Sequence, residues 1–76
     1  MRGEAATLVF EVGGMHCASC GLLIDDAVEK LAGVVTSSTD ARRGRTLVRF
    51  DPSAVAPETI VATIEEAGYQ ARQVEA

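Results

Sequence analysis

Aromatic rings and positive charge are both scarce in this sequence. It has no tryptophan, one tyrosine and two phenylalanines, and eleven acidic against seven basic residues leave a net charge of −4. A nucleic-acid-binding domain needs basic side chains for the phosphates and rings for the bases. No apolar run approaches the roughly 18 residues that cross a bilayer, and the N-terminus lacks the continuous apolar stretch of a secretory signal. We therefore expect a cytoplasmic protein that neither binds nucleic acid nor inserts directly into a membrane.

Proline and chain length are also limited. Two prolines, 47% apolar residues and 76 residues in all are typical of one small folded domain. No linker, low-complexity tract or repeat interrupts the sequence. We treat residues 1–76 as a single domain with a core over about 7–75.

The first half of the chain predicts a strand, a helix and a second strand. Residues 7–12 alternate at period two and end at Gly13-Gly14, which indicates a strand. Residues 17–31 have helical spacing, and Gly33 ends that helix. The predicted apolar face of the helix consists of Cys20, Ile24, Ala27, Val28 and Leu31, and the opposite face of Asp25, Asp26, Glu29 and Lys30. Residues 34–40 are β-branched but poor in large apolar side chains, which favours an edge strand.

The second half predicts a hairpin, a helix and a final strand. Residues 41–44 form a tight turn into a strand over 45–50. Pro57 suits the first position of a helix over 58–67, whose stripe is Ile60, Ile64 and Ala67. A last strand covers residues 69–74. The order predicts an α+β fold of the ferredoxin-like βαββαβ type, with an antiparallel four-stranded sheet and two helices on one face. That topology brings Cys17, the Arg42-Arg43 turn and Tyr69 to one end of the sheet.

Cysteine is limited to Cys17 and Cys20, at a predicted strand-to-helix junction. Because their spacing puts both thiols on one side of the first helical turn, and the helix dipole favours negative charge there, we expect thiolates. Two sulfurs cannot complete the four-ligand shell of structural zinc. Cu(I) prefers thiolates and tolerates low coordination, so it fits best. A redox pair and inert buried cysteines are the alternatives.

The motif Gly14-Met15-His16-Cys17-Ala18-Ser19-Cys20, with Ile24, Leu31, Gly33-Val34 and Ala67-Gly68-Tyr69, resembles the heavy-metal-associated domain. That family includes copper chaperones, N-terminal domains of copper- and zinc-transporting P-type ATPases, and the N-terminal domain of mercuric reductase. The resemblance covers about residues 8–71. It implies that Cys17 and Cys20 hold the metal, that Met15 anchors the loop without ligating, and that Tyr69 lies near the site.

Several positions depart from the family pattern or allow two interpretations. His16 is either an exposed loop residue or a third ligand. Gly21 follows the second cysteine and predicts a loose first turn, because glycine weakens a helix. Ser37 and Thr39 replace apolar residues and predict a thinner core. Arg42 and Arg43 are either solvated or steer docking onto an acidic partner, and Tyr69 either covers the core or shields the metal.

The resulting functional expectation is a non-enzymatic cytosolic metallochaperone. It binds one Cu(I) through Cys17 and Cys20 and delivers it to a P-type ATPase by thiolate exchange. Zn(II) or Hg(II) are alternative cargoes. The chain is alternatively an N-terminal domain of a copper or zinc transporter, or a domain that feeds Hg(II) to a reductase. We expect a monomer, with a copper-bridged dimer as the alternative.

Overall fold

A computed structural model describes residues 5–14 and 19–74 of the chain. The elements follow in the order β1 (Ala6–Gly13), α1 (Ser19–Glu29), β2 (Val34–Asp40), β3 (Arg45–Phe50), α2 (Pro57–Glu66) and β4 (Gln70–Val74). This βαββαβ order is the predicted one.

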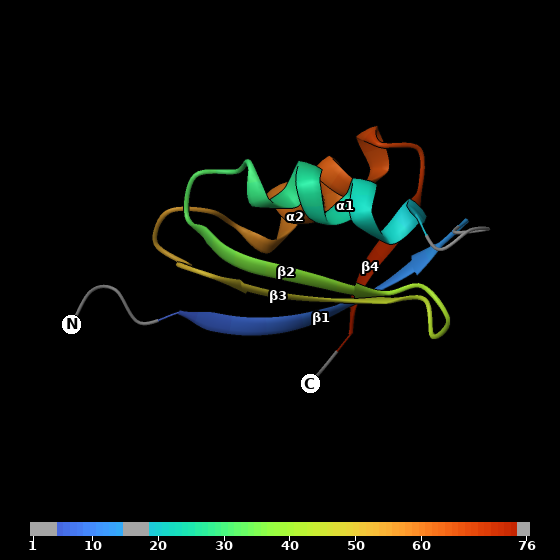
Figure 1. Cartoon of the computed structure of the whole chain (residues 1–76). Coiled ribbons are helices and arrows are strands. Elements are labelled where there is room, and N and C mark those ends of the chain that lie inside the picture. Colours follow the sequence, from blue (N-terminus) through green and yellow to red (C-terminus); the bar gives the residue numbers. More distant parts are fainter. Residues whose placement is uncertain (1–4, 15–18, 75–76) are drawn as a thin grey trace.

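The four strands form one antiparallel sheet in the order β2-β3-β1-β4, and both helices lie on the same face of it (Figure 1). In the register, Phe10 of β1 is opposite Thr46 of β3, and Val12 is opposite Ala71 of β4. Strand β2 lies at one edge, as its polar composition predicted. The α+β, ferredoxin-like fold is therefore confirmed.

The core lies between the sheet and the helices. Alternation in β1 and β3 places Phe10, Val48 and Phe50 on the covered face, each at most 1% exposed. The helices contribute Ile24 and Val28 from α1 and Ile60 and Ile64 from α2, all fully buried. At about 25 cal/mol per Å² of apolar surface removed from water, each such side chain stabilises the fold by roughly 1.5–3 kcal/mol.

Three expectations about the helices need correction. Helix α1 ends at Glu29, two residues earlier than predicted, because Leu31 N–H donates to Val28 O in a tighter turn. Asp25 is half-buried and bonds to β2, although the helical spacing placed it on the face opposite the apolar one. Ala67 is the exposed C-cap residue of α2 and does not continue the buried stripe.

The loop after α1 explains one glycine. Gly33 has φ +96°, and a Cβ there would lie 2.7 Å from Ala54 Cβ. Its carbonyl accepts a hydrogen bond of 2.7 Å from Asp51 N. Only glycine adopts this conformation at such close approach without strain, so the position holds the α1–β2 loop against the segment that follows β3.

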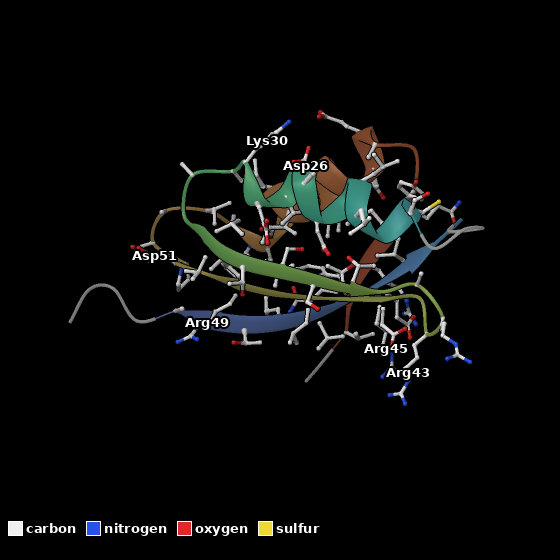
Figure 2. The ribbon with its side chains drawn as sticks, in the orientation of Figure 1. Asp26, Lys30, Arg43, Arg45, Arg49 and Asp51 are labelled. Carbon is white, nitrogen blue, oxygen red and sulfur yellow. The ribbon has the colours of Figure 1, made fainter. Side chains whose placement is uncertain are left out.

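Charge is divided between the two layers of the domain. The helices carry six carboxylates, those of Asp25, Asp26, Glu29, Glu58, Glu65 and Glu66, and one amine, that of Lys30, directly follows α1. Arg45 and Arg49 project from β3 on the open face of the sheet, and Arg43 lies on that side at the hairpin (Figure 2). The helical layer is therefore negative and the open sheet face is positive.

Candidate metal centre

Of the two cysteines, Cys20 lies in the described part of the structure. It is the second residue of α1 and is buried, with 9% of its surface exposed. Cys17, His16 and Met15 lie outside the described residues, so their predicted roles stay predictions. Within residues 5–14 and 19–74, no group of three His, Cys, Asp or Glu side chains is close enough to hold a metal ion.

The residues that flank the cysteine loop meet the hairpin and β4 at one end of the sheet, as predicted. Gly13, near the end of β1, is opposite Gln70 at the start of β4, and Val12 N–H donates to Gly44 O over 2.8 Å. A Cβ built on Gly14 would lie 3.8 Å from the Tyr69 ring. These segments line an open groove of about 620 Å³.

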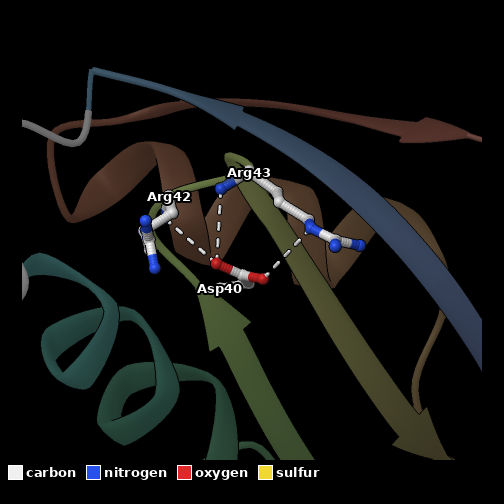
Figure 3. A network of polar contacts seen from close by, with 3 residues as sticks. All are labelled: Asp40, Arg42 and Arg43. Atoms are coloured by element: carbon white, nitrogen blue, oxygen red, sulfur yellow. Dashed lines mark hydrogen bonds and ion pairs between the residues drawn. The ribbon is translucent and has the colours of Figure 1, made fainter.

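The hairpin at this end is held by Asp40 (Figure 3). Its Oδ1 accepts hydrogen bonds from the backbone N–H groups of Arg42, over 3.1 Å, and Arg43, over 3.3 Å. The Arg43 guanidinium lies 3.7 Å from Oδ2 of the same carboxylate. Because this ion pair is exposed, it contributes about 0–1 kcal/mol. Both arginine side chains remain accessible from solvent.

Tyr69 is half-buried and packs against the apolar core. Its backbone N–H donates to Ile64 O over 3.4 Å, which ties the start of β4 to α2. The side chain therefore covers the core beside Gly14, as one of the two interpretations predicted. The same placement leaves its ring beside the residues that lead into the cysteine loop.

Gly21 makes a closer contact than the sequence indicated. It is buried, and a Cβ there would lie 3.1 Å from Thr39 Cγ2 and 3.3 Å from Thr39 Cβ. The first turns of α1 therefore lie directly against β2. The expectation of a loose turn at Gly21 is wrong at this contact, because the missing side chain makes room for Thr39.

Two leucines beside Cys20 were missed by the sequence reasoning. Leu22 and Leu23 are 71% and 61% exposed on the outer side of α1. The sequence does predict their exposure, because neither leucine lies on the helix face that carries Ile24 and Val28 into the core. Adjacent exposed apolar side chains of this size are typical of interaction surfaces.

Comparison with protein families matches residues 9–70 to the heavy-metal-associated domain. The match covers most of β1, the cysteine loop, both helices, β2 and β3, and it ends at the first residue of β4. The chain belongs to the heavy-metal-associated domain family.

Curated relatives include long transporters and a short chaperone. The chain is 38% identical over 72 residues to the copper-transporting ATPase HMA5 of Oryza sativa, which covers 95% of the chain and 7% of the transporter. It is 34% identical over 65 residues to the copper chaperone CopZ of Enterococcus hirae, which covers 86% of the chain and 94% of the chaperone. The chain thus spans less than a tenth of the transporters it matches and nearly the whole chaperone.

Solved structures share this fold. A copper-binding domain from the P-type ATPase HMA7 superposes with a TM-score of 0.87 at 34% identity, covering 97% of this chain and 95% of that domain. Oxidised MerP of Ralstonia metallidurans superposes with a TM-score of 0.89 at 22% identity, covering 93% of this chain, which shows a shared fold. In the described residues, neither helix is long and apolar enough to cross a bilayer.

Proposed function

We propose that this domain binds one Cu(I) through the thiolates of Cys17 and Cys20 and transfers it to a P-type ATPase as a cytosolic metallochaperone. The observation that carries the proposal is the Cys-x-x-Cys motif at the β1–α1 junction of a heavy-metal-associated domain. Its likeness to a copper chaperone over nearly the whole of that protein supports a carrier over an enzyme. The domain makes and breaks no covalent bond in a substrate.

The chemistry needs only the two sulfurs and their setting. Cu(I) is a soft ion that binds thiolates and accepts two or three ligands. The start of α1 supplies the positive end of a helix dipole, which favours an anionic centre. A partner thiolate then adds as a third ligand before one sulfur of this domain leaves. Transfer follows without releasing the ion into water.

Two surfaces at the same end of the domain suit partner docking. Leu22 and Leu23 are exposed directly beside Cys20 and provide apolar contact area. Arg42 and Arg43 lie on the hairpin at the end of the sheet where β1 leads into the cysteine loop. We propose that the leucines contact the transporter and that the arginines steer an acidic part of it toward the cysteines.

A second candidate is an N-terminal metal-binding domain of a transporter. It is favoured by the similarity to transporters, among them a zinc-transporting ATPase of Synechocystis that is 41% identical over 63 residues. The metal chemistry is the same, with Zn(II) as a further cargo. Here the domain would receive the ion from a carrier and pass it to the rest of its own chain.

An anaerobic competition assay tests the metal proposal. Reduced protein is titrated against a Cu(I) chelator of known affinity, with Zn(II) and Hg(II) titrations in parallel. We expect one Cu(I) per chain in the wild type, and at least a hundredfold weaker binding in Cys17→Ser and Cys20→Ser, because one thiolate remains. Ser38→Ala, at an exposed position of β2, is the matched control and retains full affinity. Equal capture by the cysteine variants would refute the proposal.

A further inference from the structure

A polar cluster joins α1 to β2 beneath Cys20. We name it the α1–β2 polar cluster, and its members are Asp25, Glu29, Ser37, Thr39 and Thr46. Asp25 Oδ1 accepts hydrogen bonds of 2.7 Å from both the Ser37 and the Thr39 hydroxyls, and Oδ2 accepts one of 3.1 Å from Thr39 N. Glu29 Oε2 accepts the Ser37 N–H over 3.0 Å. Four hydrogen-bond donors of β2 therefore bond to two carboxylates of α1.

Through the hydroxyl of Thr39, the cluster reaches the buried side chain of Thr46. Thr39 has one hydroxyl proton, and the Asp25 carboxylate only accepts, so that proton points to Asp25. In the 2.9 Å contact between the two threonine hydroxyls, Thr46 is therefore the donor. Thr46 is fully buried, and Thr39 is the partner that its hydroxyl finds there. Loss of the Thr39 hydroxyl leaves buried polar groups unpaired.

Thr39 contacts α1 at two places, both just C-terminal to Cys20. Its methyl group lies against Gly21, where an added Cβ would be 3.1 Å away, and its hydroxyl donates to Asp25 one turn further along. Gly21 is the immediate neighbour of Cys20 in the helix. The part of α1 that directly follows this cysteine is therefore held against β2 at two points.

We infer that Thr39 and Asp25 are positioning residues that control how often the Cys20 thiol becomes accessible. Cys20 is buried in the closed helix, and an incoming thiol or chelator reaches its sulfur when the first turns of α1 move away from β2. Such openings are local and are governed by the contacts of that segment alone. Resting on the proposed function, the cluster sets the rate of metal exchange at Cys20 while leaving the affinity unchanged.

A metal-free experiment tests the inference first. In a Cys17→Ser background, Cys20 is the remaining thiol, and its alkylation by iodoacetamide is measured beside urea unfolding. We expect Thr39→Val to raise the alkylation rate about tenfold, the order expected for losing a hydrogen bond to a charged acceptor. Thr39→Ser keeps the hydroxyl and stays within about twofold of the parent. Ile60→Val is the control for overall stability. Ile60 is a buried residue of α2, so this variant lowers the free energy of unfolding but leaves the alkylation rate unchanged.

Three results would overturn the inference. These are an unchanged rate in Thr39→Val, an equal rise in Thr39→Ser, or an equal rise in Ile60→Val, which would mean that Cys20 is exposed by unfolding of the whole domain. If Thr39→Val does not fold, Asp25→Ala removes the acceptor of both Thr39 bonds from the helix side and should raise the rate several-fold.

A second measurement separates access from binding. With both cysteines present, Thr39→Val should speed the removal of Cu(I) by a competing chelator about tenfold, with an affinity within about twofold of wild type. The rate changes and the affinity does not, because the first turns of α1 remain closed nearly all the time even when they open ten times more often. A more than tenfold loss of affinity would overturn the inference. Failure of the wild type to bind Cu(I) would refute the proposed function and leave the alkylation result standing.

Discussion

Replacing Gly21 by alanine should destabilise this domain, although alanine is the better helix former. Inside a helix the exchange is worth about 1 kcal/mol in favour of alanine. The added Cβ would lie 3.1 Å from Thr39 Cγ2 and 3.3 Å from Thr39 Cβ, so the strand has to give by a few tenths of an ångström. Overpacking of this kind costs about 1–3 kcal/mol. We expect Gly21→Ala to lower the free energy of unfolding by about 1 kcal/mol.

The sign should reverse when the obstructing methyl group is removed. Thr39→Ser keeps the hydroxyl that donates to Asp25 but deletes Cγ2, the atom closest to the new Cβ. In that background, Gly21→Ala should raise the free energy of unfolding by about 0.5–1 kcal/mol. The coupling between the two positions is then about 1.5–2 kcal/mol, within the range for residues in contact.

Urea unfolding of the four reduced, metal-free proteins measures this cycle, with the slope of the transition checked for constancy. Ala62→Gly in α2 is the control, because Ala62 is exposed and reports helix propensity alone. It should cost about 1 kcal/mol. Stabilisation of the wild type by the full propensity difference, or an equal effect of Gly21→Ala in both backgrounds, would contradict this prediction.

Three further predictions concern the site and the core. Reversing the charges of Arg42 and Arg43 to glutamate should slow metal transfer to an acidic partner domain in stopped-flow assays, and the effect should shrink as salt rises; a salt-independent rate equal to wild type would contradict steering. His16→Ala should weaken Cu(I) affinity by no more than a few-fold in chelator competition, and a loss of several orders of magnitude would make His16 a ligand. Ile64→Ala should lower the free energy of unfolding by about 2–5 kcal/mol, because the side chain is fully buried, and a change below 1 kcal/mol would show that the core collapses around it.

Local patterns predicted most of the architecture because each element carries its own signal. Period-two alternation placed Phe10 and Val12 on the buried face of β1. Pro57 begins α2 as its fixed backbone angle favours, and Gly33 ends the turn after α1 with positive φ. The meeting of the β1 end, the hairpin and Tyr69 followed from strand order alone.

The remaining contacts depend on tertiary packing, which periodicity does not encode. Asp25 belongs to the charged positions of α1 by sequence, but β2 lies close enough to take its carboxylate as a partner. Ser37 and Thr39 predicted a thinner core, whereas their hydroxyls meet that carboxylate. Gly21 predicted a weak turn because the sequence does not show which side chain fills the space beside it.

The carboxylates of α1 also affect how molecules of this domain meet at high concentration. An edge strand such as β2 normally exposes backbone N–H groups that can pair with a strand of a neighbouring molecule and start aggregation. Here the amides of Ser37 and Thr39 already donate to Glu29 and Asp25. Growth of the sheet by pairing along β2 would have to break both bonds and bring another backbone next to two negative charges. The same side chains thereby discourage the domain from polymerising through this edge.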